Sequence, residues 1–309
     1  MGTGAAGSEI IVFDCSGRKL WSSSIGMQNG NEEYMQVPPL PAGTYRILLR
    51  EDDKTQMVMP MDSINCPGCE RSLMDNYLSL ADTARCLGMG LKEATREIGR
   101  ADLQTVMYQG RKCYLRRDII QWLTKEFGSF AADRLVAAEQ SNAETVGIDP
   151  ATLLITDMLF SRIILPYRVG TASSMLRTIA SEACKTGALY DEKALLEQLT
   201  LREQAYSTAL RCGAALTHPL DISKLYVEHS MLMLFKPPHP LPFGEESGKL
   251  TALFFLLMFP VANEHLHILA RLNRMLRSKD FIDSLLVIRD EKEMLDIIEQ
   301  RETELVSRF

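Results

Sequence analysis

The stretch Cys212-Gly213-Ala214-Ala215-Leu216-Thr217-His218-Pro219 closes the loop that precedes the most apolar part of the chain. Two near-continuous apolar runs follow it, at residues 228–235 and 250–259. Such runs are typical of strands that helices cover on both faces. Helical patterns surround them, at residues 171–186, 191–203, 263–276, 281–286 and 293–300. We therefore predict an α/β domain over residues 151–309, a mixed sheet flanked by helices, with Asn263 capping the helix that follows the second run.

The histidines are concentrated in this C-terminal domain. All five fall in the last third of the chain, at positions 218, 229, 239, 265 and 267. Arg202 lies sixteen positions before His218, and His265 follows the second apolar run. Two imidazoles and a guanidinium suggest phosphate chemistry. A histidine at the end of a strand or loop is also a common structural residue, so these residue types alone leave both readings open.

Length and composition indicate a multidomain protein without a membrane segment. The 309 residues exceed the usual size of one domain, and the net charge of -6 argues against indiscriminate coating of nucleic acid. The first residues lack the features of a signal peptide, so we expect a cytoplasmic protein with reduced cysteines. The apolar run at 250–259 is far shorter than the roughly 20 residues of a membrane-spanning helix, so no membrane insertion is expected.

Residues 1–72 have the pattern of a small β-rich domain. Short apolar runs alternate with turn-forming Gly, Pro and Asn, which predicts an antiparallel sandwich or barrel. Cys66 and Cys69 have the spacing of half a zinc site or of a redox pair, but the surrounding sequence favours a plain turn with two thiols. No second close cysteine pair or nearby histidine completes a zinc site, and no cofactor is expected.

Residues 73–127 read as two short helices joined at a glycine turn, then a hairpin and a third helix, which is the order of a winged helix-turn-helix. The segment resembles the excisionase and MerR-like DNA-binding family. Residues 77–125 hold nine Lys and Arg against five Asp and Glu. The resemblance implies contact with DNA, whereas helix-turn-helix folds also serve as protein-docking modules, and Glu93 and Glu97 would repel phosphates. The candidate DNA-binding residues are Lys92, Thr95, Arg96, Arg111 and Lys112.

Residues 128–150 contain a helical piece that we interpret as a linker. It could equally supply a dimer helix, because its apolar residues need to be buried, so a homo-oligomer is possible.

The C-terminal domain resembles the enzyme IIA components of the bacterial phosphoenolpyruvate:sugar phosphotransferase system, of the fructose/mannitol and nitrogen-regulatory type. Arg202-Glu203, Thr208, Gly213, Ala215 and His218 stand at the spacings of that family's motif, and His265-Leu266 with Leu269 matches its second histidine segment. The resemblance implies that His218 accepts a phosphoryl group from HPr or a nitrogen-branch analogue. His265 would then be its partner, Arg202 a clamp for phosphate oxygens, and Thr208 a hydroxyl donor.

The chain departs from the motif in the loop before His218. Ala209-Leu210-Arg211 replaces the family's Gly-Ile-Gly, and Thr217 replaces a proline. Glycines permit a close approach of the backbone to phosphate, so the loop could present His218 differently, or Arg211 could replace the lost backbone donors with a side-chain charge. We expect a regulatory phosphotransfer protein that couples His218 to the winged helix. The alternatives are an enzyme IIA-like docking module that is not phosphorylated, and a DNA-binding transcriptional regulator.

Overall fold

The computed structural model describes the backbone of four N-terminal strands, at residues 8–14, 19–25, 45–51 and 54–60, and then residues 77–307 apart from positions 102, 109, 167 and 246. The Cys66 and Cys69 pair lies outside the described residues. The N-terminal strands are β1 (Ser8–Asp14), β2 (Lys19–Ile25), β3 (Tyr45–Glu51) and β4 (Lys54–Pro60). They pair antiparallel in the order β2-β1-β3-β4. Among the described residues this is a single sheet, and not the sandwich or barrel that we expected.

The next elements follow the order expected for residues 77–125. They are β5 (Tyr77–Ser79), α2 (Leu80–Cys86), α3 (Leu91–Arg100), β6 (Thr105–Tyr108), β7 (Arg111–Leu115) and α4 (Arg116–Glu126). The three strands form a small antiparallel sheet in the order β5-β7-β6. Ser79 begins α2 because its hydroxyl accepts a hydrogen bond from the Asp82 amide, while the Asp82 carboxylate accepts from the Ser79 amide.

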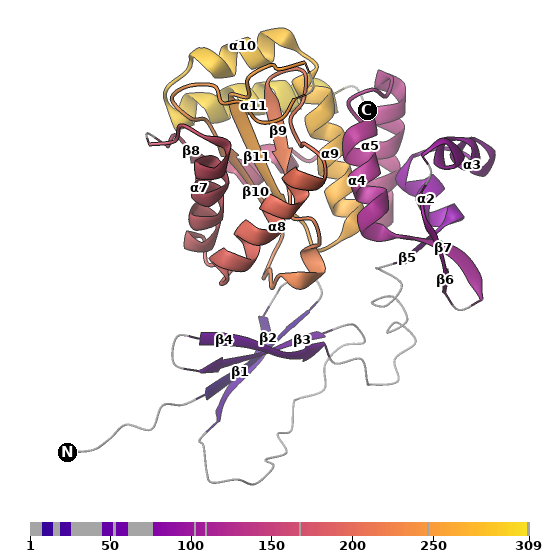
Figure 1. Cartoon of the computed structure of the whole chain (residues 1–309), viewed down its shortest axis with the longest axis vertical. Helices are drawn as coiled ribbons and strands as arrows, with labels where there is room; N and C mark the ends of the chain where they lie inside the picture. Colours follow the sequence, from indigo (N-terminus) through magenta and orange to yellow (C-terminus); the bar gives the residue numbers. More distant parts are fainter. Residues whose placement is uncertain are drawn as a thin grey trace.

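Helix α5 (Ala132–Val146) lies in the segment that we interpreted as a linker, and it packs along α9 (Ala262–Leu276). Figure 1 shows α4 and α5 beside α9, with α2 and α3 on the far side of α5. Gly88, with φ of +61°, brings the turn between α2 and α3 against α5, where an added Cβ would lie 2.3 Å from the Ala137 carbonyl carbon. Asn142 of α5 donates to the Cys86 carbonyl oxygen at 2.8 Å. The helix therefore contacts the elements on both sides of it in the chain.

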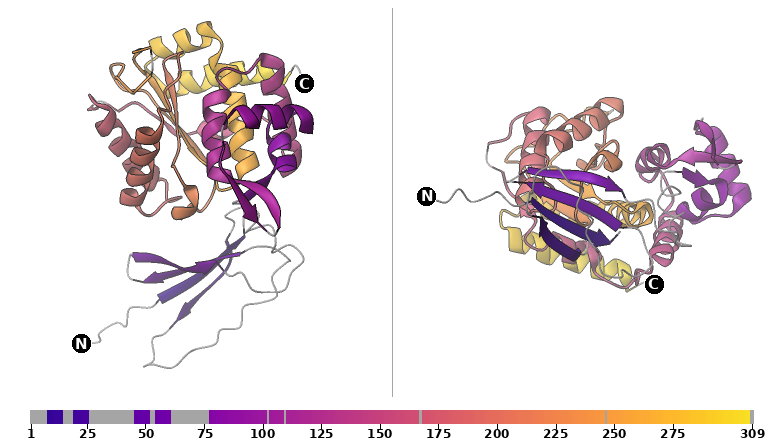
Figure 2. Two further views of the ribbon diagram at one scale, coloured as in Figure 1. Left: turned by 45° about the vertical axis from the view of Figure 1, so that its right-hand side comes forward. Right: turned by 90° about the horizontal axis from the view of Figure 1, so that it is seen from below.

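The C-terminal part is a four-stranded mixed sheet flanked by helices, as predicted. Strands β8 (Ile163–Ile164), β9 (Ala214–Thr217), β10 (Met231–Phe235) and β11 (Leu253–Met258) pair in the order β8-β10-β11-β9. Only the central pair, β10 and β11, is antiparallel. The helices around this sheet, besides α9, are α6 (Leu154–Leu159), α7 (Ala172–Lys185), α8 (Glu192–Ala205), α10 (Lys279–Val287) and α11 (Glu291–Val306). Figure 2 shows the sheet between the α7–α8 layer and the layer that contains α9.

The strands of this sheet are almost entirely apolar because each strand supplies side chains to two hydrophobic cores. Met233, Phe254 and Leu256 belong to the cluster that includes residues of α7 and α8. Leu234 and Phe255, their neighbours along the strands, belong to the cluster that includes residues of α9, α10 and α11. Fully burying one such side chain contributes roughly 1.5–3 kcal/mol. The second cluster continues without a break through α5 and α4 into α2 and α3.

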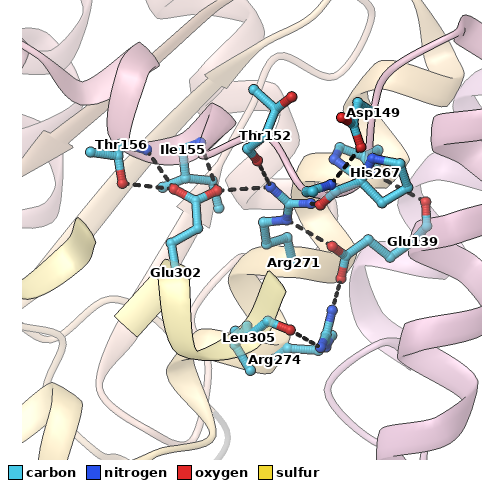
Figure 3. A network of polar contacts seen from close by, with 12 residues as sticks. Glu139, Asp149, Thr152, Ile155, Thr156, His267, Arg271, Arg274, Glu302 and Leu305 are labelled. Carbon is cyan, nitrogen blue, oxygen red and sulfur yellow. Dashed lines mark hydrogen bonds and ion pairs between the residues drawn. The ribbon is translucent and has the colours of Figure 1, made fainter. Parts of the chain in front are cut away.

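Buried ion pairs fasten α5 and α11 to α9 (Figure 3). Arg271 of α9 donates from Nε to Glu139 of α5 at 2.7 Å and from Nη1 to Glu302 of α11 at 2.9 Å. Arg274 also pairs with Glu139, and Glu302 accepts from the Thr156 amide and hydroxyl at the start of α6. These charges are almost completely shielded from solvent, so each one depends on the others for neutralisation.

The start of α9 differs from the sequence-based expectation. The helix begins at Ala262 with Val261 at its N-cap, and no side chain caps it. Asn263, which we expected to be the cap, instead donates from Nδ2 to the Asn142 side-chain oxygen of α5 at 2.8 Å. The amide group of Asn263 is therefore used between helices, which the local sequence does not indicate.

Candidate functional site

Parallel pairing of β9 with β11 brings the two candidate histidines together. His218 directly follows β9, and His265 lies in the first turn of α9, seven residues after β11 ends. The carboxyl ends of parallel strands meet at one edge of a sheet, where open α/β folds bind ligands. The rings of His218 and His265 meet edge to face with centroids 5.3 Å apart.

The hydrogen bonds of His218 distinguish its two ring nitrogens. Nδ1 lies 3.1 Å from the Pro219 carbonyl oxygen, which can only accept, so Nδ1 carries the proton. Nε2 accepts from the Nε of Arg202 at 3.2 Å, so Nε2 holds the free electron pair. The neutral ring thus presents Nε2 as its nucleophilic atom.

Burial keeps both imidazoles neutral. The pKa of His218 lies well below its usual 6.5 because burial disfavours the cation, and the charge of Arg202 and the neighbouring His265 act in the same direction. Burial also lowers the pKa of His265 to about 3, with further contributions from Arg116 and Arg202. A neutral imidazole is the form that can accept a phosphoryl group.

Arg202 supplies the positive charge of the site. It lies in the last turn of α8, is only 1% exposed, and donates to the Tyr206 carbonyl oxygen as well as to His218. Its Nη2 has no hydrogen-bond partner, and in the described part of the chain no carboxylate forms an ion pair with it. The Nε2 of His265 is likewise buried without a partner. Two buried nitrogen atoms without hydrogen-bond partners, Nη2 of Arg202 and Nε2 of His265, destabilise the site unless a ligand satisfies them.

Thr208 lies in the loop before β9, but its hydroxyl is committed elsewhere. It donates to Glu203 at 2.7 Å, and the same carboxylate accepts from the Thr208 amide and from the Ser207 hydroxyl. Thr208 is therefore tied to the end of α8 in this structure, and its oxygen can still accept a hydrogen bond.

The departures from the family's motif have a structural explanation. Leu210 and Ala214 are joined by a backbone hydrogen bond of 2.7 Å, so the loop doubles back as a tight turn. Gly213 alone takes a left-handed conformation there, with φ of +90°, which favours glycine. Thr217, at the position of the motif's proline, donates its hydroxyl to the Phe255 carbonyl oxygen at 2.8 Å and so joins β9 to β11.

Sequence reasoning missed the contribution of α4 to this site. The Thr124 hydroxyl oxygen lies 3.3 Å from Nε2 of His218, and the Lys125 ammonium lies 4.5 Å from the centroid of the Tyr206 ring. Arg116, at the start of α4, donates to the Pro260 carbonyl oxygen at 2.6 Å. His218 is only 3% exposed beneath this helix. No local signal could have indicated these contacts, because 94 residues separate Thr124 from His218.

The candidate DNA-binding residues all lie on the surface. Lys92, Thr95 and Arg96 are exposed on α3, and Arg111 and Lys112 are exposed on β7. The opposite side of α3 buries Ala94 and Ile98. The acidic residues of α3 point to α5, where Glu93 pairs with Arg134 at 2.5 Å and Glu97 lies 3.8 Å from the same guanidinium.

The part of the chain that the structure describes lacks two kinds of feature. It contains no group of three or more His, Cys, Asp or Glu side chains arranged to hold a metal ion. None of its helices is long and apolar enough to cross a membrane.

The fold and the paired histidines define an α/β domain with a buried, cationic site at the ends of parallel strands. Residues 160–301 match the family described as phosphoenolpyruvate-dependent sugar phosphotransferase system, EIIA 2. A nitrogen regulatory protein of Bradyrhizobium diazoefficiens is 32% identical over 149 residues, which cover 47% of this chain and 94% of that protein. Through this C-terminal part, the chain belongs to the enzyme IIA family, as the sequence motif predicted.

Several solved structures are similar to this C-terminal part of the chain. The nitrogen regulatory protein IIA-Ntr from Neisseria meningitidis is 23% identical, with a TM-score of 0.42, and the match covers 47% of this chain and 99% of that one. Mannitol IIA from Escherichia coli is 19% identical, with a TM-score of 0.40, over 45% of this chain and 96% of that one. The likeness of residues 73–127 to excisionase and MerR-like proteins stays a prediction.

Proposed function

We propose that the chain is a regulatory phosphotransfer protein in which Nε2 of His218 accepts a phosphoryl group from HPr or a nitrogen-branch analogue. The proposal rests on the enzyme IIA family of the C-terminal part and on the unprotonated state of Nε2.

In the transfer step, the electron pair of Nε2 forms a bond to phosphorus while the bond between phosphorus and the carrier breaks. The carrier keeps the electron pair of the broken bond, and no electrons are gained or lost overall. The proton on Nδ1 stays in its hydrogen bond to Pro219. The protein mainly positions the groups in line and neutralises charge.

The observation that carries the proposal is the pair of unsatisfied buried groups beside His218. Nη2 of Arg202 and Nε2 of His265 lack partners in the structure, and a phosphoryl group on Nε2 of His218 brings oxygens that could accept from both. His265 would donate from Nε2 to an oxygen of that phosphoryl group.

Incubation of the full chain with phosphoenolpyruvate, enzyme I and HPr, or their nitrogen-branch counterparts, tests the proposal by intact mass. We expect one acid-labile phosphate on the wild type and on His239→Ala, and none on His218→Ala. His239 is a suitable control because it is exposed and lies in the loop after β10, outside the site. Absence of phosphate on the wild type with all donors would refute the proposal and favour a docking module that is not phosphorylated.

DNA contact is a second candidate function, favoured by the surface of α3. Lys92, Thr95 and Arg96 face solvent, whereas Glu93 and Glu97 face Arg134, so the repulsion expected from the two carboxylates is reduced. The logarithm of the DNA-binding constant falls linearly with the logarithm of the salt concentration, and each phosphate contact that is removed makes this slope shallower by about one. A double change of Lys92 and Arg96 to Ala should reduce that slope by about two, while Lys193→Ala on the exposed side of α8 should not. Equal slopes would remove this candidate.

A further inference from the structure

Helix α4 covers the phosphoacceptor through contacts at both of its ends. Thr124 and Lys125, in its last turn, reach His218 and the Tyr206 ring. Arg116, in its first turn, reaches the Pro260 carbonyl in the loop between β11 and α9. The helix therefore touches both chain segments that build the site, the one leading to His218 and the one leading to His265.

The covering helix occupies the position that a phosphoryl donor needs. Reacting atoms must approach to about 3–3.5 Å in line with the electron pair before transfer can occur. That distance from Nε2 of His218 is already taken, on one side by Nε of Arg202 at 3.2 Å and on another by the Thr124 hydroxyl at 3.3 Å. Arg202 can become a ligand of the phosphoryl group, whereas Thr124 brings with it the whole of α4.

We infer that α4 is an autoinhibitory helix that closes the phosphoacceptor site, so that His218 receives a phosphoryl group only after α4 has moved away. The inference rests on the proposed function, because it names how that same site is regulated. The phosphocarrier and α4 compete for the same surface around His218. Phosphoryl transfer therefore occurs only in the fraction of molecules in which α4 has moved away from His218.

Movement of α4 would also affect the two elements that adjoin it in the chain, β7 and α5. The helix starts at Arg116, directly after β7 ends at Leu115, so no loop separates it from the β5-β7-β6 sheet. Its other end leads into α5, which the buried pairs of Glu139 hold on α9. Opening of the site therefore displaces the β7 end of the winged-helix elements and changes how they contact α5. Phosphorylation at His218 would in this way be transmitted to the surface that carries Lys92 and Arg96.

Single substitutions in α4 test the inference in the full chain. Arg116→Ala removes the anchor to Pro260, and Lys125→Ala removes the contact with the Tyr206 ring at an exposed position where folding is not at risk. Arg117→Ala is the matched control, because it removes an exposed arginine from the same helix. Two rates are measured for each protein: phosphorylation by the phosphorylated carrier, and modification of His218 by diethyl pyrocarbonate, followed by peptide mass.

We expect Arg116→Ala to raise both rates about ten-fold, the factor that corresponds to one lost hydrogen bond of a charged donor. Lys125→Ala should raise both rates by a smaller factor, about two- to five-fold. Arg117→Ala should match the wild type. If no protein is phosphorylated but modification of His218 still accelerates, the proposed function fails and the closing role of α4 stands. If all proteins react with carrier and reagent at equal rates, α4 is not a barrier and the inference is overturned.

Discussion

Acidification should destabilise the folded chain through His265, whose buried ring resists protonation. The pKa of this residue falls from 6.5 to about 3 on folding, mainly because burial disfavours the cation. Below pH 6.5 the unfolded chain binds a proton that the folded chain does not bind. The stability contribution is therefore complete above pH 6.5 and is lost as the pH falls towards 3.

The loss of unfolding free energy depends on how far the pH lies below 6.5, the pKa of His265 in the unfolded chain. Each pH unit below 6.5 costs about 1.4 kcal/mol per histidine while the folded form stays neutral. At pH 5 the single ring of His265 should lower the free energy of unfolding by about 2 kcal/mol relative to pH 7.5. The ring is 4% exposed, so solvent screens this contribution little. His218 adds a loss of the same sign, because its pKa is also well below 6.5.

Urea unfolding of the wild type and of His265→Gln, at pH 7.5 and pH 5.0, isolates the contribution of one ring. Glutamine cannot take up the proton, so the variant should lose about 2 kcal/mol less than the wild type over this interval. Carboxylates titrate in both proteins and cancel in the comparison. Equal losses in the two proteins would show that His265 can be protonated in the folded state, and the argument from burial would be wrong.

Three other substitutions have effects that the packing determines. Glu139→Gln leaves two buried arginines short of a carboxylate and should cost about 3–5 kcal/mol in urea unfolding, while Glu144→Gln, exposed on the same helix, should cost less than about 0.5 kcal/mol. Gly88→Ala should lower the melting temperature by several degrees, because the new methyl group would overlap the α5 backbone, whereas Gly99→Ala in the open should leave it unchanged or raise it. Lys236→Met should cost about 2 kcal/mol or more in chemical unfolding, because the ammonium is buried and donates to three carbonyls at the end of α10. Equal stability of each variant and the wild type, or of Glu139→Gln and its control, would contradict the corresponding argument.

The sequence predicted best what depends on strong periodic patterns. The helices near 171–186 and 191–203 match α7 and α8 within two residues, and the two apolar runs contain β10 and β11. The resemblance to the enzyme IIA family implied that His218 and His265 are neighbours, and in the structure the centroids of their rings are 5.3 Å apart. The prediction succeeds because His218 directly follows β9 and His265 lies in the first turn of the helix after β11, and the carboxyl ends of these two parallel strands lie at the same edge of the sheet.

Contacts between distant segments were not predictable from local patterns. The polar side chain of Asn263 indicated a helix cap, yet its amide binds Asn142 on another helix. The segment 128–150 indicated a connector, since nothing in its composition reveals that Glu139 has two arginine partners more than 130 residues away. Thr124 could not be assigned to the site for the same reason. In each case tertiary packing decides what a side chain contacts, and single-sequence reasoning sees only its neighbours along the chain.

The burial of α9 affects where this chain could be divided. Thirteen of its fifteen residues are buried, although a helix on the outer layer of a sheet ordinarily exposes one face. Helix α5 covers the side of α9 that would otherwise be exposed, and α5 lies before the region matched to the enzyme IIA family. A fragment that starts at residue 151 would keep Arg271 and Arg274 but lose Glu139, and it would expose the apolar surface that α5 covers. The smallest fragment able to fold alone and remain unaggregated should accordingly begin before residue 132, some thirty residues upstream of the boundary that homology suggests.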